Sequence, residues 1–170
     1  NAPSAALFEA DPPLQAFAAA ARDTARASPA SIYARAGCPK VTILPPAKVG
    51  KQDRYHLAVS LIEDVTIGLC RFKALSIIAP HTAWQLSVSG NPGLLRTLAI
   101  DYVIETQIQN RGGEHWLSVK LVNAASREIL WTERYSFEQA RTAHHYRELS
   151  VQIILSLVDK IERAELTLYA

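Results

Sequence analysis

The sequence contains no methionine and only two cysteines among its 170 residues. Because a natural chain begins with methionine, we expect a segment of a longer protein, in which Asn1-Ala2 resembles the remainder of a cleaved tag. Cys38 and Cys70 are too few for the disulfide framework of a secreted protein, and they lack the spacing of metal ligands. We expect both to be buried, unpaired thiols in a reducing compartment rather than partners in a disulfide.

Long hydrophobic runs and clusters of one charge are also absent. The longest apolar stretches, Ala74–Pro80 and Val151–Val158, fall far short of the roughly 18 residues of a membrane-spanning helix, and no basic stretch precedes an apolar run at the start as in a signal peptide. Eighteen Lys and Arg face sixteen Asp and Glu, a net charge of +2, and the basic residues are scattered. This pattern predicts no membrane segment and no direct contact with nucleic acid.

The residues that are present are those of a globular protein, 49% hydrophobic and 20% charged. A chain of this length suits one domain with a short appendage. Asp11 as N-cap and Pro12 as first helical residue predict an N-terminal helix that reaches about Ala27. The expected divisions are an N-terminal helix and linker (1–39), the folded domain (40–166) and a C-terminal tail (167–170).

The first half of the folded domain has the pattern of a β-α-β unit. Val41–Leu44 forms a short strand that Pro45-Pro46 ends, and apolar residues then repeat every three or four positions between Leu57 and Phe72, which predicts a helix. A second apolar run, Leu75–Ala79, predicts a buried strand parallel to the first. The stretch 81–89 is open between a short helix and a loop, and a brief helix is expected over 94–100.

The second half alternates between apolar and polar residues. Strands are expected over 102–109, 115–123 and 128–137, joined by tight turns into an antiparallel meander, and an amphipathic helix is expected over 142–166. Together these elements predict an α/β fold with a mixed sheet of about five strands, β-α-β-α-β-β-β-α, after the N-terminal helix. The expected core residues are Ile43, Leu61, Val65, Leu69, Ile77, Ile104, Val119, Trp131, Ile153 and Leu157.

Several of these strings, in this order, resemble a known family over about residues 40–160. They are Val41-Thr-Ile-Leu-Pro45, the helix containing Leu61–Leu69, Leu75–Ala79, Leu98–Glu105, Leu117–Ala125 and, above all, Ile129-Leu-Trp-Thr-Glu-Arg-Tyr135. The chain is similar to the TolB amino-terminal-like domain. That domain occurs in multidomain bacterial transcriptional regulators, including CadC-like and antibiotic-regulatory activators, and in nucleotide cyclases.

The resemblance implies a non-catalytic regulatory or protein-interaction domain of a cytoplasmic transcriptional regulator. Its partners would be the DNA-binding and tetratricopeptide-repeat domains of the same chain, and a homodimer is left open. Two alternatives are a periplasmic interaction domain like the one that begins TolB and a regulatory domain attached to a nucleotide cyclase. An enzyme would require a small molecule bound in a cleft near residues 45–54.

The residues themselves show no catalytic or metal-binding pattern. Adjacent side chains in a helix point about 100° apart, so His144 and His145 cannot chelate one metal together, and an exposed first turn is expected. The resemblance implies that Glu63-Asp64 lies on the solvent side of its helix. His56, His81 and His115 stand alone, without ligands at the usual spacing. We therefore expect no metal, no cofactor and no enzymatic activity.

Two places are candidates for binding a partner. Ligands of sheets with parallel strands usually sit at the carboxyl ends of those strands, and there the sequence places Lys48, Lys51 and Arg54 after the first strand and His81 and Trp84 after the second. These basic and aromatic residues suit an anionic small molecule or an acidic protein segment, although a solvated loop would have the same composition. Trp116 shares a strand face with Ser118 and Lys120, so it is expected on the wet side of the sheet as an anchor for a partner.

Overall fold

A computed structural model describes residues 37–48, 54–89, 92–137 and 142–168. The predicted N-terminal helix and Lys51 lie outside these residues. The described elements in chain order are β1 (Lys40–Ile43), β2 (Ala47–Lys48), α2 (Tyr55–Leu69), β3 (Ser76–Ile77), α3 (Pro80–Ser89), α4 (Pro92–Thr97), β4 (Tyr102–Arg111), β5 (Glu114–Asn123), β6 (Ile129–Ser136) and α5 (Ala143–Leu168).

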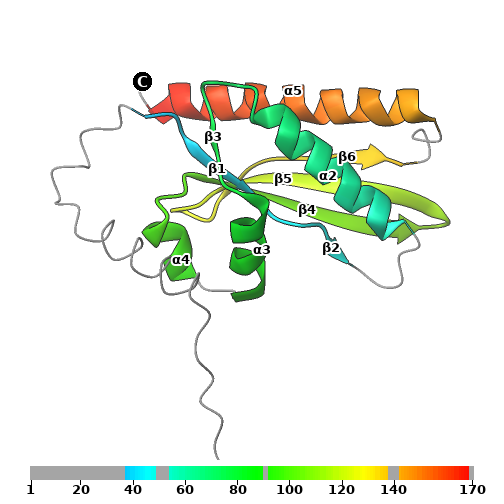
Figure 1. The fold of residues 1–170 in the computed structure, drawn as a ribbon, viewed down its shortest axis with the longest axis horizontal. Coiled ribbons are helices and arrows are strands. Elements are labelled where there is room, and N and C mark those ends of the chain that lie inside the picture. Colours follow the sequence, from blue (N-terminus) through cyan, green and yellow to red (C-terminus); the bar gives the residue numbers. More distant parts are fainter. Residues whose placement is uncertain (1–36, 49–53, 90–91, 138–141, 169–170) are drawn as a thin grey trace, which may run out of the picture. The chain divides into compact units, whose positions relative to one another are not determined.

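The sheet is mixed, as the sequence predicts, and has six strands (Figure 1). Its order is β3-β1-β4-β5-β6, with β1 parallel to both β3 and β4, while β4, β5 and β6 form the antiparallel meander. The additional strand is β2, which runs parallel to β4 through Ala47 opposite Gln107 and Lys48 opposite Ile108. Strand β1 therefore ends before the two prolines, as expected. After them the chain pairs with β4 again, through β2.

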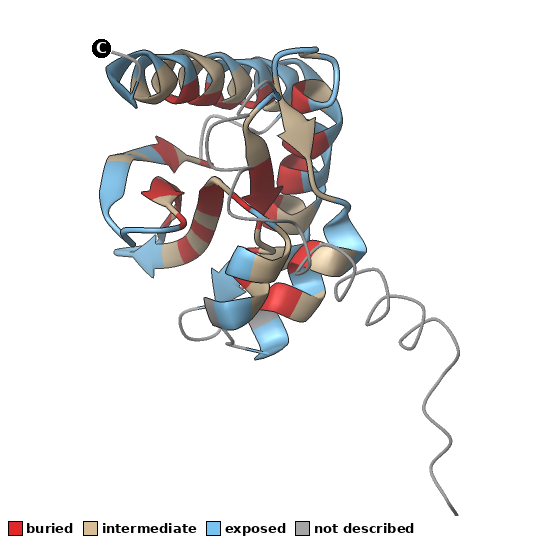
Figure 2. Ribbon diagram, turned by 90° about the vertical axis from the view of Figure 1, so that its left-hand side faces the viewer, coloured by how far each residue is buried: buried red, intermediate tan, exposed pale blue. Residues whose placement is uncertain are grey.

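Helices α2 and α5 cover one face of the sheet and bury the main core. The buried residues of α5 lie on the side of the helix that faces the sheet, where the ribbon is red in Figure 2. Eight of the ten predicted core residues are buried, whereas Ile77 and Trp131 are partly buried and pack against the edge of this core. Ile77 lies in the two-residue edge strand β3, and Trp131 lies in the edge strand β6, so each has a neighbouring strand on one side only.

A smaller core lies on the opposite face, beneath α3 and α4. It contains Leu86 and Leu95 from these helices, together with Val103 and Val122 from the central strands. The stretch that the sequence left open between helix and loop is thus helix α3. Helix α4 ends earlier than expected because Ala99 adopts a left-handed backbone with φ of 52°. The small helices cover only one end of this face.

The first residues of the parallel strands β1 and β4 are fixed by polar contacts. The backbone N–H of Lys40 donates to the Asp101 carboxylate at 2.8 Å, and the N–H of Asp101 donates to the carbonyl of Lys40 at 2.9 Å. The hydroxyl of Tyr102 donates to the carboxylate of Glu165 at 2.6 Å, which ties β4 to the last turns of α5. None of the described helices is long and apolar enough to cross a membrane.

The cysteines differ from the prediction. Cys38 and Cys70 are unpaired, as expected, but both are exposed rather than buried. Cys38 precedes β1, where its thiol donates to the carbonyl of Lys73 at 3.1 Å, and Cys70 follows the last turn of α2. Both lie beyond the ends of elements, where the apolar faces that build the core no longer continue.

Candidate protein-interaction site

The side of the meander that faces away from the main core is polar beyond the end that helices α3 and α4 cover. Alternate residues of β4, β5 and β6 point to opposite sides of the sheet. Of those that point away from the main core, Val103 and Val122 are buried in the smaller core and Ser118 is buried, whereas the others are half-buried or exposed. We call this side the open face. Its members are Glu105, Gln107, Gln109, Trp116, Ser118, Lys120, Thr132 and Arg134.

Trp116 is the large aromatic residue of the open face. The strand register places Gln109 opposite it on β4 and Ser136 opposite it on β6. Gln109 donates through its side-chain amide to the Gln107 side-chain carbonyl at 3.1 Å, so two amides of β4 are aligned along the strand. A half-buried tryptophan among amides is amphipathic, since its ring offers apolar contact area and its indole N–H can donate to a partner.

A hollow of about 290 Å³ adjoins this face where β1 ends. Its walls come from Pro45 and Ala47 on one side and from Glu105, Gln107 and Lys120 on the other. Glu105 and Lys120 are directly opposite each other in the β4–β5 register, so the hollow contains one acidic and one basic side chain. Groups of both signs beside amides suit a peptide segment, which carries donors and acceptors together.

Of the predicted basic residues, Lys48 and Arg54 are described by the structure, and neither lines the hollow. Lys48 places its ammonium 4.0 Å from the centre of the Tyr55 ring, a cation–π contact. Arg54 immediately precedes α2, where its carbonyl accepts the N–H groups of Leu57 and Ala58. A hollow thus lies at Pro45, after the end of β1, but its polar walls come from Glu105, Gln107 and Lys120.

His81 and Trp84 belong to α3. The ring of His81 lies 3.3 Å from the side-chain amide of Gln85, one turn along the helix, and Trp84 is 54% exposed. Neither residue lines the hollow. The sequence placed both at the end of the second parallel strand, and because α3 begins directly at Pro80, they are carried on a helix instead of a loop.

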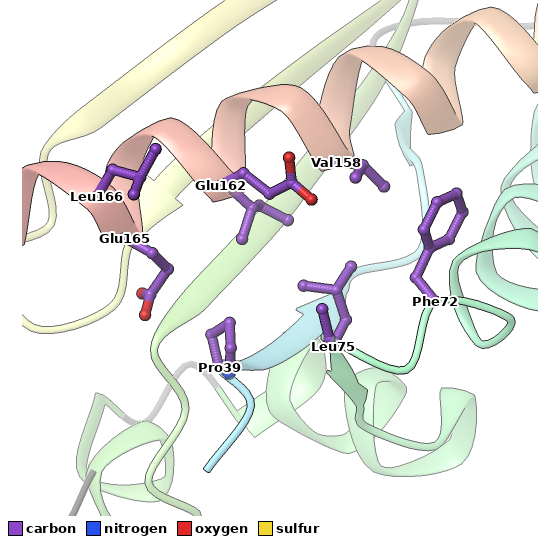
Figure 3. A pocket seen from close by; sticks show the side chains of 9 residues that line it. Pro39, Phe72, Leu75, Val158, Glu162, Glu165 and Leu166 are labelled. Atoms are coloured by element: carbon purple, nitrogen blue, oxygen red, sulfur yellow. The ribbon is translucent and has the colours of Figure 1, made fainter. Parts of the chain in front are cut away.

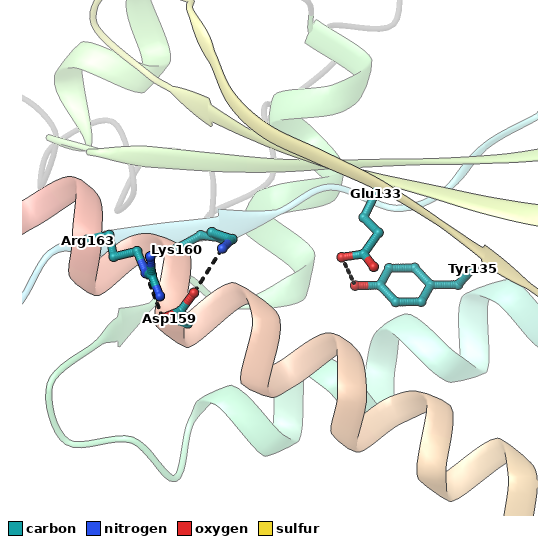
Figure 4. Close-up of polar contacts among 5 residues, drawn as sticks. All are labelled: Glu133, Tyr135, Asp159, Lys160 and Arg163. Carbon is teal, nitrogen blue, oxygen red and sulfur yellow. Dashed lines mark hydrogen bonds and ion pairs between the residues drawn. The ribbon is translucent and has the colours of Figure 1, made fainter.

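Two polar clusters of the described residues lie away from the hollow, one around Asp159 and one around Tyr135. Asp159 accepts from Arg163 at 2.8 Å and from Lys160 at 3.0 Å, and these hydrogen bonds hold the pKa of its carboxyl below the ordinary value (Figure 4). Burial, together with the neighbouring Glu133 carboxylate, raises the pKa of Tyr135 to about 12; the two groups are hydrogen-bonded at 3.1 Å. Neither cluster lines the hollow.

The histidine and carboxylate pairs lie where the sequence predicted. His144 and His145 are exposed in the first turn of α5, with ring centroids 6.0 Å apart, and His144 pairs with Glu148 at 3.1 Å. Glu63 and Asp64 face solvent on α2. Within the described ranges, no three His, Cys, Asp or Glu residues are grouped so that they could hold a metal ion.

Solved structures that match this chain include three from bacteria. TolB from Acinetobacter baumannii matches with a TM-score of 0.50 and 14% identity over 73% of this chain, which spans only 28% of that protein. A putative neuraminyllactose-binding hemagglutinin homolog from Helicobacter pylori matches with a TM-score of 0.48 and 12% identity over 76% of this chain and 91% of the other. The LpoB C-terminal domain from Escherichia coli has a TM-score of 0.45 and 11% identity over 58% of this chain and 81% of the other.

At these identities the likeness concerns the fold, and the match to TolB agrees with the resemblance found in the sequence. No curated protein matches the sequence. A family model does, over residues 36–154, and that range contains the whole sheet and the open face. The chain belongs to the family of the HilA/YgeH-like transcriptional regulator, second domain.

Proposed function

We propose that this domain is a non-catalytic protein-interaction and regulatory domain of a cytoplasmic transcriptional regulator, and that the open face is its contact surface. Family membership supports the role in transcription. A net charge of +2 over 170 residues supports a division of labour in which another part of the regulator contacts DNA, because such a charge neutralises few phosphates. The partner is then a protein, either another domain of the same regulator or a separate chain.

The observation that carries this proposal is Trp116 on an uncovered, otherwise polar sheet face. Tryptophan is enriched among residues that dominate binding energies at protein interfaces, particularly where polar residues surround it. On the open face it lies one strand away from the aligned amides of Gln107 and Gln109. Lys120 and Glu105 extend the same face toward the hollow, so a partner would meet an aromatic anchor and groups of both charges.

The test compares two matched pairs of substitutions in the complete regulator. Trp116→Ala with Lys120→Ala removes the anchor and a charge from the open face. Trp84→Ala with Arg96→Ala makes the same chemical change on helices α3 and α4, at two exposed positions. A reporter gene measures regulation, co-purification measures partner binding, and thermal melting of each variant checks that the domain is folded.

We expect the open-face pair to lose both regulation and binding by about tenfold or more while melting normally, since interface anchors contribute roughly 2 kcal/mol or more. The control pair should behave like the parent protein. Full regulation by the folded open-face pair would contradict the proposal. Loss confined to the control pair would assign the contact to α3, where the sequence also suggested Trp84.

A further inference from the structure

A second cavity lies away from the open face, against the C-terminal half of α5. It has a volume of about 400 Å³ and is bounded by α5, by the segment that joins α2 to β3, and by the residue before β1 (Figure 3). Its walls include the half-buried side chains of Phe72, Leu75 and Val158. Leu166, which is 71% exposed, stands at its edge. This volume lies within the range of cavities that bind small molecules, roughly 300 to 1,000 Å³.

Two carboxylates of α5, Glu162 and Glu165, are part of this otherwise apolar lining. Glu165 accepts the hydroxyl of buried Tyr102 at 2.6 Å, so one of its oxygens is fixed in place. Glu162 has no hydrogen bond or ion pair with any residue that the structure describes. The two basic residues that flank Glu162 on the helix, Lys160 and Arg163, are both engaged by Asp159 (Figure 4).

The cavity therefore combines apolar walls with a negative charge that the described part of the chain does not neutralise. An anionic occupant would be repelled by Glu162, and a neutral one would shield this carboxylate from water without offering it a charged partner. An ammonium group avoids both costs, since it carries three donors and a positive charge. We propose that this cavity binds a small amphiphilic cation, an alkyl- or arylammonium whose apolar group packs on Phe72, Leu75 and Val158 and whose ammonium pairs with Glu162.

Such a ligand would connect elements that are distant in the sequence. Phe72 and Leu75 belong to the connection after α2, whereas Val158 and Glu162 belong to α5. An occupant that contacts both would stabilise their packing by mass action, to an extent set by its concentration relative to its Kd. The cavity shares no residue with the open face. A negative result for ligand binding in the cavity would therefore leave the proposal for Trp116 unaffected.

The probe for the test is n-hexylammonium, compared with n-hexanol and hexanoate of the same chain length. Calorimetric titration of the 170-residue protein measures affinity, and amide chemical-shift changes in the ¹⁵N-labelled protein locate the site. We expect hexylammonium to bind about tenfold more tightly than hexanol, with hexanoate weaker still, because a charge-assisted hydrogen bond distinguishes them. The largest shifts should fall on the amides of Leu75, Val158 and Glu162.

Three substitutions separate charge, shape and non-specific effects. Glu162→Gln should reduce hexylammonium binding to the level of hexanol, while Glu114→Gln, the same change in the exposed β4–β5 hairpin, should have no effect. Ala74→Phe fills the cavity from an exposed position and should abolish binding of both probes without altering melting. Equal affinity for hexylammonium and hexanol, an unaffected Glu162→Gln variant, or shifts confined to another surface would each overturn the proposal.

Discussion

Replacing Gly68 with alanine tests how closely helix α2 packs against α5. A β-carbon at this position would overlap the Cδ1 methyl of Ile154 on α5 and would lie 3.2 Å from its Cγ1. Gly68 thus allows the two helices to approach, and Ile154 fills the space that the missing side chain leaves. Because Ile154 is only half-buried, its terminal methyl can move when alanine is introduced, although the packing must adjust.

Two opposing effects set how much Gly68→Ala changes the free energy of unfolding. Alanine in place of glycine within a helix raises the free energy of unfolding by about 0.5 to 1 kcal/mol. Overpacking against Ile154 lowers it by about 1 to 3 kcal/mol, so the single substitution should be neutral to destabilising. Ile154→Val removes the Cδ1 methyl and costs about 0.5 to 1.5 kcal/mol by itself. In that background Gly68→Ala should instead stabilise the protein, because the overlap has been removed.

Urea unfolding of the parent, both single variants and the double variant completes the cycle. We expect a coupling free energy of about 1 kcal/mol or more in favour of the double variant. If the two substitutions are additive within about 0.5 kcal/mol, the helices do not touch at Gly68 and Ile154, and the α2–α5 arrangement described here is wrong at that contact.

Three further outcomes are expected. Leu157→Ala should lower the free energy of unfolding by about 2 to 5 kcal/mol, since Leu157 is fully buried and alanine leaves a cavity; an unchanged urea midpoint would contradict its place in the core. The pKa of Tyr135 is about 12 in the folded chain against an ordinary value of 10.0, so its contribution to stability is complete below pH 10 and lost as the pH rises toward 12. Tyr135→Phe should flatten the fall in unfolding free energy over that interval, and identical slopes for the two proteins would refute the assignment. The 170-residue protein should bind duplex DNA weakly and lose that binding with added salt; tight, sequence-selective binding in an anisotropy titration would refute the division of labour proposed above.

Elements with a regular period were accessible from the sequence, whereas very short pairings were not. The alternation from Tyr102 onward is long enough to define three strands and their faces, and α5 begins and ends within two residues of the expected positions. Strand β2 has only two residues, so no period exists that could reveal it. The irregular pairing between Leu121 and Val122 likewise depends on how two strands meet and is not encoded in either strand alone.

The candidate site shows the same division. The alternation of Trp116 and Lys120 with core residues was sufficient to place them on the polar side of the sheet, where the structure has them. That Glu105 faces Lys120 requires the register of β4 against β5, which single-strand patterns do not give. The cavity beside α5 is harder still to predict from the sequence, because its lining residues Phe72 and Val158 are separated by more than half of the chain. The sequence does place Leu166 beside Glu165 near the end of the last helix, and the structure shows that this leucine is exposed at the edge of the cavity. A leucine at a helix end is common, however, so it does not by itself predict a binding site.

Pro39 and Leu166 line the same cavity, which means that the chain enters β1 and leaves α5 at neighbouring points. In Figure 1 these points lie at one end of the sheet, and the β4–β5 hairpin lies at the other. A circular permutant could therefore join the end of α5 to the start of β1 through a short linker. Its new N- and C-termini would lie at Gly112-Gly113. Those glycines are exposed, with φ of 63° and 87°, so new ends there would interrupt a turn and leave the buried strand segments intact. In such a rearranged chain, tags or fluorophores could be carried at the hairpin end, far from the C-terminal end of α5, without lengthening any connection inside the core.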